Sequence, residues 1–169
     1  MTAALYLVRH AKSSWADITV DDHDRPLRNR GRRRAAGLAS WLEERSLGCD
    51  LVLCSTALRT RETLDILLPV LGNTEIRYEE GLYHGDARHL VSLLRRTPSS
   101  MERVMVVGHD PVLQMTAQYL AATATGDAMD RLDRKFPTSA LAMLTFGSAG
   151  WTALRQHMGH LEFFFIPPD

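Results

Sequence analysis

This sequence of 169 residues contains only two lysines and two cysteines, and it has no formal net charge. The two cysteines, Cys49 and Cys54, lie too close together in one short segment to suggest a disulfide framework. Twenty basic and twenty acidic side chains give a formal charge of zero, so a general attraction to nucleic acid or to an anionic membrane is not expected. The first ten residues lack the basic leader and apolar stretch of a signal peptide, and no run approaches the roughly 18 apolar residues of a membrane span. We therefore expect a cytoplasmic protein without nucleic-acid or membrane partners, in which any anion site is built locally.

Repeats, low-complexity tracts and Pro/Gly/Ser-rich linkers are also lacking, which predicts a single domain over residues 1–169. Apolar residues make up 45% of the chain, as is typical of a globular protein with a core of its own. Only Lys12 and Lys135 are lysines, so eighteen of the twenty cations are arginines. Arginine suits forked recognition of phosphate, although a GC-rich genome gives the same bias.

Short β-rich apolar runs alternate with longer helical patterns, which favours a three-layer α/β/α fold with a mostly parallel central sheet. The pattern is unclear at residues 121–138. A four-residue turn sequence, 147–150, predicts a hairpin near the end of the chain. We expect strands at residues 3–8, 50–54, 75–78, 103–107, 139–146 and 152–158, and helices at 29–46, 57–71, 86–95 and after Pro111.

Polar, reactive residues follow three of these predicted strands. The segments are VRH at residues 8–10, CSTALR at 54–59 and VGHD at 107–110. In open α/β sheets, the ligand crevice lies beyond the carboxyl ends of the strands. We therefore expect the three segments to meet, although about 50 residues separate one from the next.

The side chains brought together in this way suit a tetrahedral oxyanion. Arg9 and Arg59 offer paired donors that match two phosphate oxygens. A neutral imidazole, from His10 or His109, can attack phosphorus to give a covalent phosphohistidine that water later cleaves. The arginines would stabilise charge in the transition state and would also disfavour protonation of the nucleophile. This chemistry requires no metal or cofactor.

The same segments resemble the motifs of the histidine phosphatase superfamily, whose fold is shared with phosphoglycerate mutase. Residues 7–13 (LVRHAKS) look like its signature strand end, 55–63 (STALRTRET) resemble its Ser-x-x-x-Arg-x-x-x-Thr motif, and 107–111 (VGHDP) resemble its third motif. The chain is most similar to the small phosphohistidine phosphatases of SixA type, on account of its short length and of residues 25–27 (RPL) and 136–140 (FPTSA).

The resemblance implies a role for each matching residue. His10 would be the nucleophile, Arg9 and Arg59 would clamp phosphate oxygens, and His109 would donate a further hydrogen bond. Arg25 matches an arginine near the pocket mouth that contacts phosphate or substrate, although a loop ion pair with Asp22 or Asp24 is an equally good interpretation. The family's leaving-group acid has no clear counterpart. Glu79 and Glu80 follow the third predicted strand, and we favour Glu80.

The uncertain acid bears on the substrate. An alkoxide leaving group needs a proton, so a missing acid would slow phosphomonoester cleavage by ~10²–10⁴-fold. An imidazole protonated on its ring nitrogen leaves more readily. The sequence therefore favours a phosphohistidine-carrying protein as partner and substrate over a small phosphorylated metabolite, which remains the alternative.

Three other interpretations compete with this one. A cysteine phosphatase needs five residues between cysteine and arginine, whereas four separate Cys54 from Arg59. His157 and His160 lack companion ligands for a metal, and a turn at a strand end explains them better. The arginine cluster at residues 28–34 would support a non-catalytic phosphate- or RNA-binding module, but such clusters are usually solvated helix faces.

Overall fold

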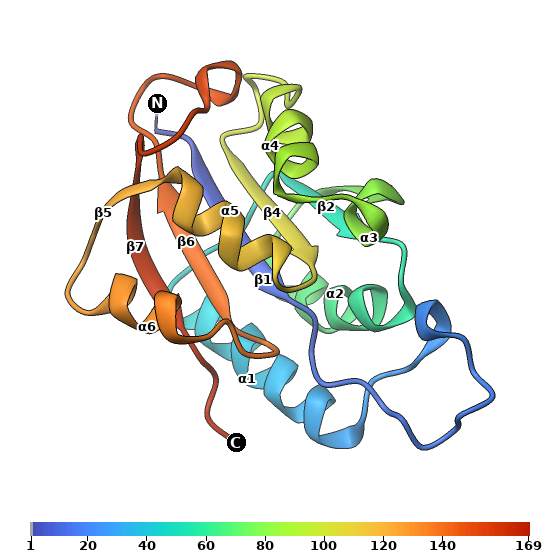
Figure 1. The fold of residues 1–169 in the computed structure, drawn as a ribbon. Coiled ribbons are helices and arrows are strands. Elements are labelled where there is room, and N and C mark those ends of the chain that lie inside the picture. The colour runs from blue at the N-terminus through green and yellow to red at the C-terminus, as the bar shows by residue number, and fades with distance from the viewer. Residues whose placement is uncertain (1) are drawn as a thin grey trace.

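A computed structural model describes residues 2–169, and a single seven-stranded sheet forms its centre (Figure 1). The strand order is β3-β2-β4-β1-β6-β7-β5. Six strands run in the same direction, and only β6 is antiparallel to its neighbours. The predicted mostly parallel α/β fold is confirmed. The strands are β1 (Ala4–Arg9), β2 (Leu51–Ser55), β3 (Glu75–Glu79), β4 (Arg103–Gly108), β5 (Ala121–Ala124), β6 (Leu141–Thr145) and β7 (Gly159–Phe165).

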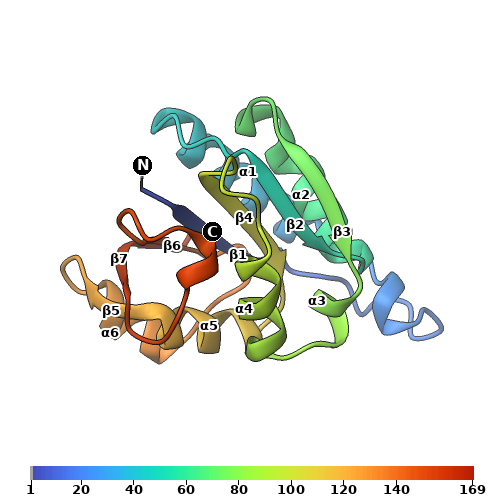
Figure 2. The same cartoon turned by 90° about the horizontal axis from the view of Figure 1, so that it is seen from above.

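Helices cover both faces of the sheet, as Figure 2 shows from above. α1 and α2 lie together on one face, and α4 and α5 pack against each other on the opposite face. This arrangement buries both faces, so the central strands are apolar throughout rather than alternating. The helices are α1 (Asn29–Glu44), α2 (Leu58–Leu71), α3 (Gly81–His84), α4 (Ala87–Arg95), α5 (Val112–Leu120) and α6 (Ala128–Arg134), with short 3₁₀ turns at Asp22–Asp24 and Trp151–Ala153.

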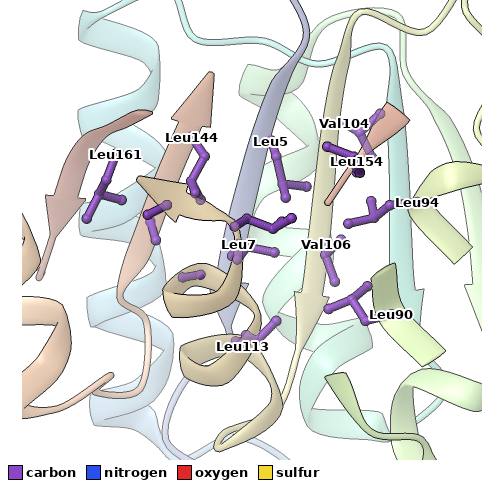
Figure 3. Packing of buried hydrophobic residues seen from close by; sticks show 14 of the residues in the cluster. Leu5, Leu7, Leu90, Leu94, Val104, Val106, Leu113, Leu144, Leu154 and Leu161 are labelled. Atoms are coloured by element: carbon purple, nitrogen blue, oxygen red, sulfur yellow. The ribbon is translucent and has the colours of Figure 1, made fainter. Parts of the chain in front are cut away.

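The core divides into two apolar layers because successive side chains of a strand point to opposite faces. From β1, Leu5 and Leu7 pack in the layer beneath α4 and α5, where Leu90 and Leu113 meet them (Figure 3). Tyr6 and Val8 belong to the layer beneath α1 and α2. No helix within residues 2–169 is long and apolar enough to cross a membrane.

The predicted final hairpin is wrong. Residues 152–158 do not form a strand. Instead, the chain makes a 3₁₀ turn at Trp151–Ala153, β7 begins at Gly159, and its pairing with β6 starts at His160. Trp151 explains the difference, because its ring is buried in the core and its indole N–H donates to the carbonyl of Met101. The connection is therefore anchored to another part of the fold rather than closed as a tight turn. Residues 121–138, which showed no clear pattern, contain β5 and α6.

The parallel strands bring the three motif segments to one edge of the sheet. Arg9 at the end of β1 pairs with Gly108 at the end of β4, and Cys54 of β2 pairs with Val107. All three strands therefore end at nearly the same level. The predicted convergence is confirmed.

Candidate active site

A cavity of about 710 Å³ lies at this edge of the sheet. It contains four residues predicted from the strand ends, together with Arg25 from the loop before α1. Most of its other side chains are also polar. The lining residues are Arg9, His10, Lys12, Ser13, Trp15, Asp22, Arg25, Arg59, Tyr83, His84, His109, Asp110 and Thr138.

His10 is held as a buried, neutral imidazole. Its backbone N–H donates to the carbonyl of Gly108 at 3.0 Å, which extends the β1–β4 pairing by one residue. Nδ1 lies 2.7 Å from the carbonyl of Ala11, so Nδ1 carries the proton and Nε2 has a free lone pair. Burial is the main cause that lowers the pKa of His10 to about 3. His109, Arg59 and Arg9 add to this effect, and the hydrogen bond to Ala11 opposes it.

His109 faces His10 across the cavity, with ring centroids 5.3 Å apart. Its Nε2 lies 2.8 Å from Oγ of Ser55. A serine hydroxyl that donates to Nε2 leaves the proton on Nδ1, which makes the other ring nitrogen a hydrogen-bond donor. Burial, followed by the charge of Arg59, lowers the pKa of His109 to about 4. Both imidazoles are therefore neutral near pH 7.

The Ser-x-x-x-Arg-x-x-x-Thr spacing has a structural basis in α2. Ser55 ends β2 and contacts His109, whereas Arg59 lies in the first turn of the helix and lines the cavity. Thr63, one turn later on the same face, accepts from the backbone N–H of Ala11 at 2.9 Å and donates to the carbonyl of Arg59 at 2.7 Å. The motif thus ties the segment after His10 to the helix that carries the arginine.

Arg59 is 6% exposed and needs a compensating anion, because a cation in the first turn of a helix opposes the helix dipole. Asp22 supplies it. The Nη1 of Arg59 donates to the backbone carbonyl of Asp22 at 2.7 Å, and Nη2 lies 3.1 Å from Oδ2 of that residue. The guanidinium is thereby fixed at the cavity wall.

Arg9 is anchored from behind. Its Nη1 donates to the carbonyl of Phe136 at 2.8 Å, and its backbone N–H donates to the carbonyl of Ala140. Burial lowers the pKa of Arg9, Asp110 raises it, and Arg59 lowers it again. The segment 136–140, which resembles SixA-type sequences, is therefore the support of this arginine.

Arg25 combines both interpretations open from the sequence. It forms an ion pair with Asp22 at 3.0 Å, and it also lines the cavity. Its Nη1 donates to Oγ of Ser13 at 2.6 Å, and the ring of Trp15 stacks on its guanidinium at 3.6 Å. Arg25 is thus a buried residue that connects Ser13, Trp15 and Asp22 within the loop at the cavity rim.

Asp22 is the main residue that sequence reasoning missed as part of the site, since it entered only as a partner for Arg25. Its carboxylate binds Arg25 and Arg59 and also accepts from the Tyr83 hydroxyl at 2.7 Å. The Tyr83 hydrogen bond is the main cause that lowers the pKa of Asp22 to about 2, and both arginines add to it. The only feature of the sequence that could have pointed to Asp22 is the acidic segment 21–24 (DDHD), and such segments are common in solvated loops.

Glu80 is not brought into the cavity. It precedes α3, and its carbonyl accepts from the backbone N–H of Tyr83. Glu79 ends β3 opposite Ser55 and is also absent from the lining. The residues of α3 that reach the cavity are Tyr83 and His84. The four strand-end residues and Arg25 thus meet, and the predicted acid does not.

Gly31 allows α1 to contact the loop after His10. A Cβ atom at this position would lie 2.3 Å from the carbonyl oxygen and 2.8 Å from the nitrogen of Lys12, which is closer than real Cβ contacts. The carbonyl of Lys12 also accepts from the backbone N–H of Arg28 at 2.9 Å. Helix and loop are therefore packed backbone to backbone.

The surroundings of Cys54 and His160 do not support the cysteine-phosphatase and metal-site interpretations. Cys54 is fully buried in β2, and burial raises the pKa of its thiol to about 12, so it is not a reactive thiolate. The ring nitrogens of His160 bond the hydroxyls of Thr123 and Thr125, on the β5–β7 side of the sheet.

Comparison with known proteins identifies the family. The family described as histidine phosphatase superfamily (branch 1) matches residues 5–90. An uncharacterized protein of Mycobacterium tuberculosis, Rv1276c, is 36% identical over 95% of this chain and 99% of its own length. The chain belongs to the histidine phosphatase superfamily.

Solved structures agree. The putative phosphohistidine phosphatase SixA of Nakamurella multipartitia is 31% identical, with a TM-score of 0.87 over 100% of this chain and 98% of its own. That of Agrobacterium tumefaciens is 29% identical, with a TM-score of 0.80 over 98% of both chains. A SixA structure complexed with tungstate, 23% identical over 97% of both chains, shares the fold at a TM-score of 0.75. The family and these neighbours support a phosphatase.

Proposed function

We propose that residues 1–169 form one metal-independent phosphatase domain, which removes the phosphoryl group of protein phosphohistidine through a covalent intermediate on His10. The observation that carries the proposal is the Nδ1 contact of His10 with the carbonyl of Ala11, which leaves Nε2 as a neutral nucleophile. The cavity also contains Arg9, Arg59 and His109, which are donors suited to phosphoryl oxygens.

In the first step, Nε2 of His10 attacks phosphorus, and the bond from phosphorus to the substrate nitrogen breaks. Arg9 and Arg59 stabilise the negative charge on the equatorial oxygens, and His109 donates a hydrogen bond to them. Because these groups supply the positive charge, the chemistry needs no metal. The other ring nitrogen of the substrate imidazole takes up a proton from solvent before the phosphorus–nitrogen bond breaks, so the group leaves as a neutral imidazole.

In the second step, water attacks the phosphorus bound to Nε2, and the N–P bond breaks to release inorganic phosphate. The same donors stabilise this second transition state. His10 regains its free Nε2 lone pair, and its low pKa keeps the ring unprotonated for the next cycle.

A proton donor for the leaving group is better sought in Asp110 than in Glu80. Asp110 lines the cavity next to His109, one of its carboxyl oxygens is buried without a hydrogen-bond partner in residues 2–169, and burial raises its pKa. Burial of the carboxyl group favours its protonated form, against the opposing charge of Arg9. Asp110→Asn should therefore slow phosphomonoester cleavage more than Glu80→Gln does.

Two features support a protein-borne substrate. The rim loop presents Trp15 at 71% exposure and Ile18 at 94%, which are apolar surfaces available to a partner. The rings of Trp15, Tyr83 and His109 line the cavity, and they suit the flat imidazole of a phosphohistidine.

A small phosphomonoester is the second candidate, because a cavity of about 710 Å³ falls within the range of small-molecule sites. Rates on a phosphohistidine protein, on phenyl phosphate and on sugar phosphates separate the two. We expect kcat/KM to be highest for the phosphohistidine protein. A higher value for a sugar phosphate would favour the second candidate.

The covalent intermediate provides the direct test. Rapid quench of the enzyme in alkali during turnover, followed by peptide mass spectrometry, should show phosphate on the peptide that contains His10. His84→Ala is the matched control, since it removes another cavity imidazole and should leave the labelling in place. Turnover without any labelled His10 would refute the mechanism.

A further inference from the structure

A second cavity lies beside the catalytic one. It has a volume of about 330 Å³ and shares three of its residues, Arg9, Lys12 and Thr138, with the catalytic cavity. Its other walls come from α1 and from the segment after α6. The lining residues are Arg9, Lys12, Arg30, Arg34, Lys135, Pro137 and Thr138. We refer to it as the side pocket.

The side pocket concentrates positive charge in a protein whose formal charge is zero. Five of its seven lining residues are cationic and none is acidic. Both lysines of the chain, Lys12 and Lys135, are among them. The catalytic cavity, in contrast, balances part of its charge with Asp22 and Asp110.

Two arginines that line the side pocket each have a donor atom without a hydrogen-bond partner. Within residues 2–169, the Nε atoms of Arg9 and Arg34 are buried and make no hydrogen bond. Other atoms of these guanidinium groups are anchored, since Arg9 donates to the carbonyl of Phe136 and Arg34 to that of Pro167. Buried donors are normally hydrogen-bonded, so these two fixed guanidinium groups keep hydrogen-bonding capacity that their protein partners do not use.

A carboxylate already lies at the edge of the side pocket. The side chain of Asp169 forms a hydrogen bond with Arg30, and its other oxygen is 3.6 Å from Nε of Arg34. This distance is too long for a hydrogen bond. The Asp169 side chain is 64% exposed, so an incoming anion can displace it at small cost.

We infer that the side pocket binds a second anionic group of the substrate, a carboxylate or a phosphate, while the phosphoryl group occupies the catalytic cavity. Arg9 and Lys12 line both cavities, so the two anions would lie side by side. The inference rests on the proposed function, because it names a second group on the substrate of that site. The anion can belong to an acidic residue near a phosphohistidine or to a small phosphorylated acid.

The test compares matched substrates with and without the second anion. One pair consists of phosphohistidine peptides with Asp or Asn next to the phosphohistidine, and the other of 3-carboxyphenyl and 3-carbamoylphenyl phosphate. For at least one pair, we expect kcat/KM to favour the anionic member by about fivefold, the effect of one partly exposed charge pair. The pair that shows the preference identifies the source of the anion.

Substitutions in and around the side pocket test whether it causes the preference for the anionic substrate. Arg30→Gln combined with Lys135→Gln should reduce it to less than twofold, whereas Asp169→Asn should increase it by removing the competing carboxylate. Arg33→Gln is the matched control, because Arg33 is exposed on the same helix and lines neither cavity. The control should retain the parent preference.

The neutral member of each pair lacks the second anion, so its turnover tests only the proposed phosphatase function. A failure of that function can therefore be distinguished from a failure of the side-pocket inference. Binding of the same pairs to His10→Ala, measured by calorimetry, gives the affinity ratio independently of turnover. The absence of a preference in both pairs, or its persistence in the double variant, would overturn the inference.

Discussion

The two halves of the catalytic cavity are built in different ways. His10, Arg9 and His109 follow central strands, are buried or half-buried, and are fixed by backbone and carbonyl contacts. The opposite half is a loop at residues 13–25, in which Trp15 stacks on the buried Arg25 and Ile18 is exposed to solvent. The candidate reacting groups are therefore held by the sheet, whereas a loop forms the rim of the cavity.

Asp22 is the link between these halves. Its carboxylate lies on Arg59 and Arg25 together, in the position of an anion at the cavity wall. A phosphoryl group that approaches Arg59 must therefore share or replace this contact. The comparison predicts large effects on chemistry from the strand-end half and smaller effects on binding from the loop half.

The largest effect should come from His10→Ala. Removal of the nucleophile should abolish phosphohydrolase turnover by at least ~10⁴-fold and leave the circular dichroism spectrum unchanged. Activity comparable to that of the parent protein would contradict the mechanism. It would also mean that the strand-end half does not have the larger effect on chemistry.

Arg59→Ala should lower kcat/KM by ~10²–10³-fold, because it removes a donor to the developing charge. Arg61→Ala is the matched control, since Arg61 is exposed on the same helix and does not line the cavity. Steady-state kinetics on phenyl phosphate measures both variants. Equal losses in the two variants would indicate a helix effect rather than a phosphate clamp.

The strand-end half should also dominate the dependence of stability on pH. The folded-state pKa of His10 is about 3, below the ordinary value of about 6.5, so the unfolded chain binds the extra proton as pH falls between these values. The free energy of unfolding should therefore keep its full value above about pH 6.5 and fall by about 3 kcal/mol per such histidine by pH 4.5. Urea unfolding at several pH values measures this slope, which His10→Asn should make shallower. A slope unchanged in that variant would argue against a buried neutral imidazole.

The loop half should show the smallest effect, in Asp22→Asn. Loss of the resident negative charge should tighten inhibition by inorganic phosphate by about fivefold, since one partly exposed charge pair no longer competes. The inhibition constant should fall even if kcat also falls through a looser Arg59. Weaker phosphate inhibition would mean that Asp22 mainly positions the arginine.

The strand ends could be predicted from the sequence because local signals were sufficient there. Buried apolar runs such as that of β1 end at reactive residues, and parallel strands must bring their carboxyl ends together. The match to family motifs supplied the roles of Arg9, His10, Arg59 and His109, which stay predictions until the variants are measured.

The features that could not be predicted depend on contacts between segments far apart in the sequence. Trp151 docks against Met101 and displaces the last strand to Gly159, which no local pattern reveals. Asp22 becomes part of the cavity through Tyr83 and Arg59, 61 and 37 residues away. Sequence periodicity carries information about local structure, and these contacts are not local.

The close approach of Gly31 to Lys12 has a consequence for mutational surveys of this protein. The contact fixes the distance between α1, which carries Arg30 and Arg34, and the loop that carries Lys12, and these residues line the side pocket together. A methyl group added there would wedge the helix outward without touching any ligand. Position 31 should therefore score as intolerant in an activity screen, although it has no side chain to take part in the reaction.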